Sequence, residues 1–232
     1  MSQLTLLDPT SIEFPPVHFA LSEPDGLLAV GGDLTDARLI NAYQNGIFPW
    51  FNEDDPIMWW SPSQRCVIDC HEFHVSRSLA KFIRKTPLRV TINHAFEDVI
   101  HQCRQPRKDG LGTWIDNKMT YAYIELHRQG NAQSIEVWEN DKLIGGLYGV
   151  SMSNVFCGES MFSIKPNGSK IALLALSKFL LAHNISLIDC QIENPHLISL
   201  GAKLIERDEF ITYISKQAPS TINWQPQELP FV

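Results

Sequence analysis

Residues 134–163, SIEVWENDKLIGGLYGVSMSNVFCGESMFS, carry the clearest structural signal in the chain. Apolar side chains recur on one face at Ile135 and Val137 and again at Leu143 and Leu147, as in a strand with one buried face. The turn-forming segments END and SMSN divide the stretch into three parts. The sequence therefore predicts three antiparallel strands joined by two short turns.

The segments on either side of this block add helices and further strands. Downstream, residues 168–183 are apolar nearly all round, which predicts a buried helix. We then expect a strand at 185–192, a short helix that begins at Asn194 and ends before Gly201, and a strand at 209–214. Upstream, the patterns predict a strand at 65–70, a helix at 75–85, a strand at 88–93 and helices at 95–104 and 117–129. This order predicts an α+β fold.

Residues 1–64 differ from the rest of the chain in composition. They are rich in proline, glycine and aromatic residues and contain one clear helix pattern, at 36–44. The stretch IFPWFNEDDPIMWW alone contains five aromatic side chains, which we interpret mainly as the core of a domain with few aliphatic residues. The sequence therefore predicts a small loop-rich domain at 1–64 and a larger domain at 65–232.

Composition and charge limit the classes of protein that fit. A formal net charge of −7 argues against general coating of nucleic acid, and no stretch is apolar enough to cross a membrane. The first residues lack the order of a signal peptide, and five cysteines without a short-domain framework favour reduced thiols. We therefore expect a soluble, cytoplasmic protein. Cys66, Cys70, His71 and His74 look like zinc ligands, but their crowding within nine residues argues against a metal site.

One basic segment departs from the acidic average. Residues 77–110 contain eight basic and three acidic side chains. In the predicted helix HVSRSLAKFIRK, the cations Arg77, Lys81, Arg84 and Lys85 share one face and no acidic residue accompanies them. Such a stripe is usually only the solvated side of a helix, but the missing counter-charges favour contact with phosphates.

The stretch DCQIENP, residues 189–195, places two polar side chains in an apolar strand. Successive strand side chains point to opposite faces, so we expect Asp189 and Gln191 on one face and Ile188 on the other. Burying an unpaired carboxylate is costly, so both groups need partners, either in a neighbouring loop or in a substrate. Glu159, flanked by apolar residues in GESMFS, also has two interpretations: a carboxylate on a surface hairpin, or a residue of a functional site. Both patterns favour a functional role.

Seven motifs, spread in order over nearly the whole chain, resemble the leucyl/phenylalanyl-tRNA–protein transferase family. They are GIFPWF, WWSP, GTWI, GGLYGV, GESMFS, SKIALL and DCQIENPHL. The resemblance implies a C-terminal acyltransferase domain related to the N-acetyltransferases (GNAT-like). It also implies transfer of Leu or Phe, and less efficiently Met, from aminoacyl-tRNA to the N-terminal Arg or Lys of proteins, which marks them for N-end-rule degradation. Because the aminoacyl ester is already activated, we expect no cofactor, ATP or metal, and we expect a monomer.

The resemblance also assigns roles to residues. Asp189 and Gln191 match the catalytic positions, with the Asp189 carboxylate fixing the Gln191 amide and Glu159 assisting by holding the amine or the aminoacyl group. Trp50 and Trp114 match positions that hold the terminal adenosine, with Phe156 close by. The basic stripe Arg77, Lys81, Arg84 and Lys85 matches the tRNA-stem contact. The pocket for the Leu or Phe side chain would be lined by Leu147, Met161, Leu173, Leu176, Leu180 and Ile188. Ile188 can share a pocket with Gln191 only if the pocket reaches around the strand or the strand twists there.

Two other functions fit parts of the sequence. An N-acetyltransferase dependent on acyl-CoA would need a glycine-rich loop for the pyrophosphate before the buried helix, where SIKPNGSK offers one glycine and a proline. A tRNA-binding module without catalysis would explain the basic stripe and the tryptophans, but it would leave Glu159, Asp189 and Gln191 without a role.

Overall fold

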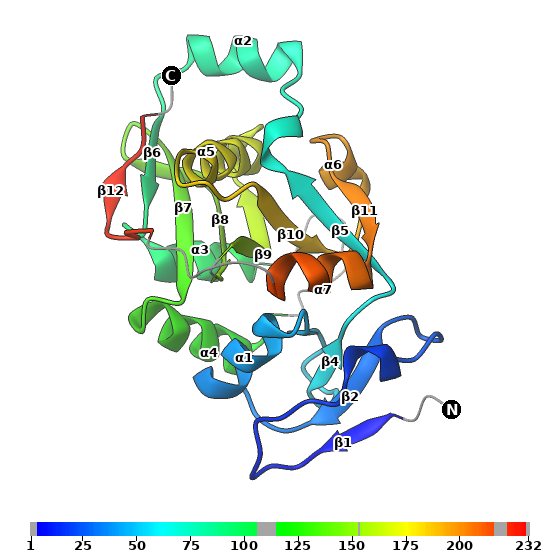
Figure 1. The fold of residues 1–232 in the computed structure, drawn as a ribbon. Helices are drawn as coiled ribbons and strands as arrows, with labels where there is room; N and C mark the ends of the chain where they lie inside the picture. The colour runs from blue at the N-terminus through cyan, green and yellow to red at the C-terminus, as the bar shows by residue number, and fades with distance from the viewer. Residues whose placement is uncertain (1–3, 106–114, 153, 216–221, 231–232) are drawn as a thin grey trace.

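The computed structural model describes residues 4–105, 115–152, 154–215 and 222–230. Within them the chain forms two β-sheets, and helices pack on both faces of the larger one (Figure 1). The smaller sheet has the strand order β1-β2-β4-β3, and the larger has the order β11-β5-β10-β9-β8-β7-β6-β12. The architecture is therefore a mixture of helices and strands, as the sequence predicted.

The smaller sheet belongs to the N-terminal part of the chain. Its short strands have too few residues to show alternation, so the sequence did not reveal them. A 3-10 helix and the predicted helix complete this part. The elements are β1 (Thr5–Leu7), the 3-10 helix η1 (Val17–Phe19), β2 (Leu27–Gly31), α1 (Asp36–Gln44), β3 (Phe48–Pro49) and β4 (Met58–Trp60).

The larger sheet begins at β5, four residues after the smaller sheet ends. The three strands predicted from residues 134–163 are confirmed as β7, β8 and β9, which pair antiparallel. All described pairings in this sheet are antiparallel except that of β9 with β10. Its strands are β5 (Gln64–Asp69), β6 (Arg89–Ile92), β7 (Ala132–Glu139), β8 (Lys142–Ser151), β9 (Val155–Ser163), β10 (Leu187–Gln191), β11 (Lys203–Glu206) and β12 (Gln227–Glu228).

Helices cover the two faces of the larger sheet and form two hydrophobic clusters. On one face, α5 packs on residues such as Leu147 and Ile188. On the other face, α3 and α4 pack on residues such as Tyr148, and this cluster continues into the N-terminal part through Leu39 and Trp59. The two parts of the chain therefore share one core. The helices are the 3-10 helix η2 (Cys70–Glu72), α2 (Arg77–Lys85), α3 (Phe96–Cys103), α4 (Asn117–Arg128), α5 (Gly168–Ala182), α6 (Pro195–Ile198) and α7 (Arg207–Ser215).

One element predicted from the sequence is wrong. Residues 209–214 were expected to form a strand, but they lie in helix α7. The β-branched and aromatic residues favour a strand only weakly, because strand preference depends on context. Phe210, which is 2% exposed, and Ile214 are four residues apart and pack into the same cluster, so tertiary packing selects the helix. Strand β11, largely exposed at the sheet edge, was not predicted.

The segment β9–α5–β10 positions the site. Its two strands run parallel and pair only from Val155–Leu187 to Cys157–Asp189, after which they separate. Helix α5 packs closely on β8 where Gly168 meets Gly145. A Cβ atom on Gly145 would come within 2.4 Å of the Gly168 Cα atom. Only glycine permits that approach. Among the described helices, none is long and apolar enough to span a membrane.

Candidate active site

A small cavity opens where β9 and β10 separate. Its volume is about 110 Å³, and it lies between these strands, β8, α5 and the start of α6. Polar side chains of Glu159, Gln191 and Asn194 meet an apolar wall there. The remaining lining residues are Leu147, Gly158, Ser160, Met161, Leu173, Ile188, Cys190 and Leu197. The cavity therefore brings two of the three predicted catalytic residues together with four of the predicted pocket residues.

The backbone at Gln191 explains how it shares the cavity with Ile188. The pairing of β10 with β5 shifts register between Asp189 and Gln191, and Gln191 has a φ of 56°. The expectation that Asp189 and Gln191 share a face opposite Ile188 is therefore wrong, because a left-handed residue ends the alternation. Gln191 turns into the cavity beside Ile188, whereas Asp189 is not among the lining residues.

Asp189 is fully buried and forms a bidentate ion pair with Arg65 on β5. Arg65 Nε and Nη2 donate to the two Asp189 carboxylate oxygens over 2.8 and 2.7 Å, and both side chains are at most 2% exposed. Arg65 Nη1 donates to the Gly46 carbonyl, and its guanidinium lies 4.8 Å from the Phe48 ring centre and 4.7 Å from that of Phe210. This geometry satisfies the buried charge. Sequence reasoning missed Arg65, although a cation opening the apolar strand RCVIDC was a visible signal.

The Asp189 carboxylate contacts the main chain of Gln191 and not its side-chain amide. The Gln191 backbone N–H donates to Asp189 Oδ1 over 2.9 Å, and this bond stabilises the left-handed turn. The Gln191 side chain instead donates from Nε2 to Glu159 Oε1 over 3.3 Å. The prediction that the Asp189 carboxylate fixes the Gln191 side-chain amide is therefore wrong. Because Nε2 is directed at Glu159, the side-chain oxygen of Gln191 is the atom suited to accept a hydrogen bond from a ligand.

Glu159 joins the cavity to the N-terminal part of the chain. The Tyr123 hydroxyl donates to Glu159 Oε2 over 2.9 Å, and the Tyr43 and Tyr123 hydroxyls lie 2.5 Å apart. Burial raises the pKa of Glu159 to about 7, although hydrogen bonds from Tyr43 and Tyr123 act to lower it. A carboxyl group with this pKa changes charge near neutral pH. Sequence reasoning missed both tyrosines.

The two other predicted pocket residues, Leu176 and Leu180, lie deeper in the core, and so does Phe156, which was predicted close to the adenosine. Leu176, Leu180 and Phe156 are fully buried in the cluster beneath α5, and they do not line the cavity. The Phe156 ring packs 5.9 Å from the ring of Trp224, centre to centre. These three residues therefore support the wall formed by Leu147, Met161, Leu173 and Ile188.

The predicted adenosine-binding residues are only partly described. Trp50 is 41% exposed and follows β3, with its ring centre 5.7 Å from that of Trp60. It does not line the cavity. Trp114 lies outside the described residues. An exposed tryptophan supported by a second ring is available to stack on a planar ligand.

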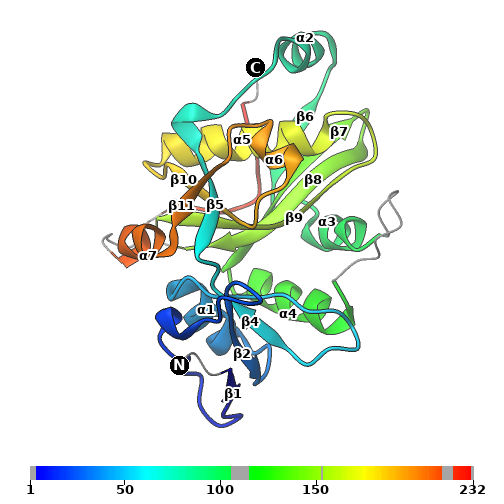
Figure 2. The same ribbon diagram turned by 90° about the vertical axis from the view of Figure 1, so that its right-hand side faces the viewer.

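Helix α2 presents the predicted basic stripe. Arg77, Lys81, Arg84 and Lys85 are exposed, and none of them forms an ion pair within the described parts of the chain. The opposite face packs through Leu79, and the Ser76 hydroxyl caps the helix by accepting from the Leu79 N–H over 3.2 Å. Figures 1 and 2 show α2 at one end of the molecule and β1 at the other, with α1 and α4 between β1 and the larger sheet.

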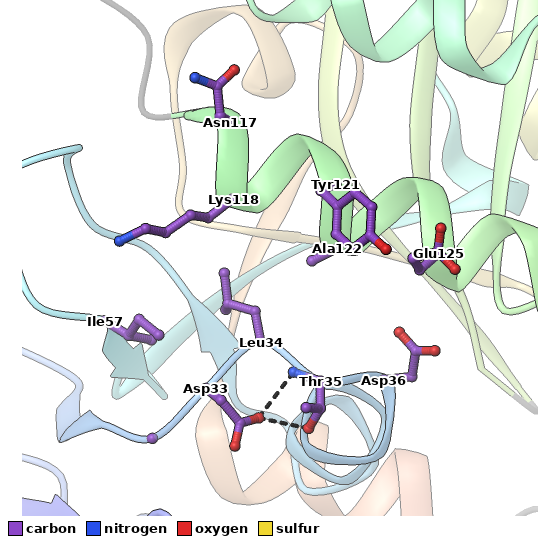
Figure 3. Close-up of a pocket in the computed structure, with 11 residues that line it drawn as sticks. Asp33, Leu34, Thr35, Asp36, Ile57, Asn117, Lys118, Tyr121, Ala122 and Glu125 are labelled. Carbon is purple, nitrogen blue, oxygen red and sulfur yellow. Dashed lines mark hydrogen bonds between the residues drawn. The ribbon is translucent and has the colours of Figure 1, made fainter.

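A second, larger groove lies between α4 and the turn that precedes α1. It has a volume of about 800 Å³, and Figure 3 shows Tyr121 and Glu125 of α4 facing Asp33 and Asp36 across it. Asp33 accepts from the N–H and hydroxyl of Thr35 over 2.9 and 2.6 Å. Burial and the nearby charge of Glu125 raise the pKa of Asp36. None of the predicted site residues lines this groove.

Metal-ligating side chains do not gather in the described residues. No group of three or more His, Cys, Asp or Glu there could hold a metal ion. The same residues include all five cysteines, and no disulfide bond joins any two of them.

Comparisons with known proteins assign the chain to one family. The model described as leucyl/phenylalanyl-tRNA protein transferase matches residues 67–215, and that of its N-terminal domain matches residues 32–63. A leucyl/phenylalanyl-tRNA–protein transferase of Shewanella baltica is 52% identical over 99% of this chain and 98% of its own length. One of Pseudoalteromonas translucida is 53% identical over 98% and 97%. Among solved structures, L-PGS from Bacillus licheniformis gives a TM-score of 0.39 at 11% identity over 72% of this chain and 53% of its own.

Proposed function

This chain belongs to the leucyl/phenylalanyl-tRNA protein transferase family, and from that premise we propose its substrates and the roles of its residues. It is an aminoacyltransferase. It transfers Leu or Phe, and less efficiently Met, from aminoacyl-tRNA to the N-terminal Arg or Lys of a protein, which marks that protein for N-end-rule degradation. The observation that carries this proposal is the cavity where Glu159 and Gln191 face an apolar wall.

The reaction joins an amine to an ester that is already activated. The α-amine nitrogen of the acceptor forms a bond to the ester carbonyl carbon, and the bond from that carbon to the ribose oxygen breaks. A proton leaves the amine, and the departing ribose oxygen gains one. The amine must be neutral to attack, and its ordinary pKa is about 7.7 to 8.0. A modest proton acceptor next to the amine is therefore sufficient.

Glu159 is the proton acceptor in this scheme. Its carboxylate borders the cavity, and its pKa of about 7 lies near that of the amine. The Gln191 side-chain oxygen accepts a second N–H of the amine and fixes its direction. Asp189 acts indirectly: its carboxylate accepts from the Gln191 backbone N–H and stabilises the left-handed conformation there, and Arg65 holds the carboxylate in place. Asp189 is therefore a positioning residue that does not touch the substrate.

The apolar wall receives the side chain of the transferred amino acid. The cavity, at about 110 Å³, is far smaller than the roughly 300–1,000 Å³ of sites that hold drug-sized ligands. Its size therefore suits a single side chain. Met161 in this wall can adapt to Leu, Phe or Met, because its unbranched side chain can repack.

Contacts with tRNA lie outside the cavity. Arg77, Lys81, Arg84 and Lys85 bind backbone phosphates of the stem, since exposed cations without counter-charges suit sequence-independent contact. Trp50 stacks on the terminal adenosine, and Trp114 is assigned the same role from the family resemblance alone. Base stacking on an aromatic side chain contributes about 1 to 3 kcal/mol.

The finer features of the architecture belong to the same proposal. Residues 65–232 form an acyltransferase domain of the N-acetyltransferase-related type, and residues 1–64 form a small domain whose core is continuous with it. The parallel β9–α5–β10 unit within a mainly antiparallel sheet, with a polar site where its strands separate, supports this assignment. We expect the protein to act as a monomer in the cytoplasm, where its tRNA substrate is found.

A transfer assay tests the proposed function. The protein is incubated with a peptide that begins with Arg and either radiolabelled Phe-tRNA or radiolabelled acetyl-CoA, and label in the peptide is measured. Label is expected from Phe-tRNA, with less transfer to a matched peptide that begins with Ala. Transfer from acetyl-CoA alone would identify an N-acetyltransferase. Retained tRNA binding without transfer would identify a non-catalytic module.

A further inference from the structure

Three hydrogen bonds connect the N-terminal part of the chain to the cavity. The Tyr43 hydroxyl on α1 lies 2.5 Å from the Tyr123 hydroxyl on α4, which donates to Glu159 Oε2 over 2.9 Å. The other Glu159 oxygen accepts from the Gln191 side chain over 3.3 Å. Tyr43 and Tyr123 are at most 2% exposed. Both carboxylate oxygens of Glu159 are therefore oriented by fixed donors.

We propose that Tyr43 and Tyr123 are positioning residues for the transfer reaction, which hold the Glu159 carboxylate toward the cavity. Through Tyr43, the N-terminal part of the chain then contributes to catalysis indirectly. The inference rests on the proposed function, because it assumes that Glu159 accepts the amine proton. Neither tyrosine lines the cavity, so neither touches the substrate. Their hydroxyls act through Glu159.

The charges around Glu159 explain why two donors are needed. The Asp189 carboxylate on β10 raises the pKa of Glu159, and the Arg65 guanidinium on β5 lowers it. Burial has the largest effect and disfavours the ionised form. The hydroxyls of Tyr43 and Tyr123 counter burial and lower the pKa of Glu159, because Tyr123 donates to the carboxylate and Tyr43 is hydrogen-bonded to Tyr123. Without them, less of Glu159 would be ionised at neutral pH.

Other titratable groups near Glu159 do not supply such a donor. Tyr148 on β8 is fully buried, and its ring centre lies 5.4 Å from that of Tyr123. Its hydroxyl has no hydrogen-bond partner within the described residues. Cys157, on the same strand as Glu159, has a pKa raised by burial, so its thiol is neutral. Tyr148 therefore offers a matched control, since it is a buried tyrosine next to Tyr123 that lies outside the hydrogen-bonded chain.

The test compares Tyr123→Phe and Tyr43→Phe with Tyr148→Phe across pH. Initial rates of Phe transfer to an Arg-peptide are measured from pH 6 to pH 9, each divided by the wild-type rate. Titration of the amine is common to all proteins and cancels in this ratio. Loss of a donor should raise the pKa of Glu159 by about one unit, so Tyr123→Phe should be about tenfold slower at pH 6 and nearly equal by pH 9. Tyr43→Phe should change in the same direction, and Tyr148→Phe should give a flat ratio near one.

Two further measurements use the Glu159→Gln variant as a background and titrate Glu159 directly. Adding Tyr123→Phe to Glu159→Gln should produce no further dependence on pH. NMR of the ¹³C-labelled Glu159 carboxyl carbon should show its pKa raised in Tyr123→Phe and unchanged in Tyr148→Phe. Flat ratios for both Tyr43→Phe and Tyr123→Phe, or the same pH effect in the Glu159→Gln background, would overturn the inference. Absence of transfer by the wild type would instead overturn the proposed function, and the NMR titration would still report the link to Glu159.

Discussion

Charged side chains near the cavity and those on helix α2 differ in burial and in pairing. Glu159 lines the cavity and is held by hydrogen bonds at both oxygens, and Asp189, next to the cavity, is fully buried and paired with Arg65. On α2, four cations are exposed and form no ion pair within the described residues. Chemistry on a single amine requires few charges in fixed positions. Contact with a phosphate backbone requires several charges that are free to adjust. Substitutions should therefore affect the two regions differently.

The largest effect is expected from Glu159→Gln. Removing a proton acceptor should lower kcat for transfer from Phe-tRNA by about 10² to 10⁴-fold, with the tRNA dissociation constant unchanged. The rate and the dissociation constant are measured on the same preparation. Glu206→Gln is the control, because Glu206 is an exposed carboxylate on the edge strand that already accepts from the Gln64 amide over 2.6 Å. A loss of less than tenfold would exclude Glu159 as the proton acceptor.

Arg65→Met should give the next largest effect, on stability. It leaves the Asp189 carboxylate buried without a counter-charge, which costs about 3 to 5 kcal/mol of unfolding free energy. Urea unfolding measures this cost. Arg65→Met combined with Asp189→Leu should be less destabilised than Arg65→Met alone, because an apolar pair replaces the ion pair. On α2, Arg84→Ala should change stability by no more than about 0.5 kcal/mol. Equal losses for Arg65→Met and Arg84→Ala would contradict the comparison.

A third effect concerns the pH dependence of stability. The pKa of Glu159 is about 7 in the folded protein, against its ordinary value of 4.5. Between these values the unfolded chain ionises while the folded protein stays protonated, so the contribution of Glu159 to stability falls as pH rises. The Glu159→Gln side chain cannot ionise, so the variant does not lose stability in this way. Its unfolding free energy minus that of the wild type should increase between pH 5 and pH 8 by at most about 3 kcal/mol. A constant difference from urea unfolding at the two pH values would show that Glu159 is not perturbed.

The smallest effect is expected on tRNA affinity. Combining Lys81→Ala with Arg84→Ala should weaken tRNA binding by about tenfold and reduce the slope of log affinity against log salt by about 2. Arg128→Ala is the control: it removes the same type of charge from α4, where Arg128 pairs with Glu97 and Glu125. Figure 1 shows α4 on the other side of the larger sheet from α2. If Arg128→Ala gives the same slope change, the charge effect is global and α2 is not a contact surface.

Local patterns predicted the elements that build the site. The alternation of residues 134–163 identified β7, β8 and β9, and the continuous apolar run identified α5. The same patterns marked Glu159 and Gln191 as polar groups in apolar strands, and both line the cavity. These features are visible in sequence because burial imposes a period of two on a strand and an apolar surface on a buried helix.

Features that depend on distant partners were not predicted. Arg65 and Asp189 are 124 residues apart, and Tyr43 and Tyr123 are 80 apart. The local periodicity of a helix or strand does not indicate which distant residues pair. The left-handed backbone of Gln191 was also hidden, because glutamine rarely adopts it and the Asp189 carboxylate must stabilise it. It is nevertheless this backbone that brings Ile188 and Gln191 into one cavity.

In the proposed scheme the cavity performs the transfer, and α2 only recruits the tRNA. The most direct test is the single-turnover rate of Phe transfer to an Arg-peptide, with wild type, Glu159→Gln and the Lys81→Ala/Arg84→Ala variant each saturated with Phe-tRNA. The α2 variant should react at the wild-type rate once saturated, and Glu159→Gln should remain at least 100-fold slower. A saturated α2 variant as slow as Glu159→Gln, or a Glu159→Gln rate equal to wild type, would contradict the account.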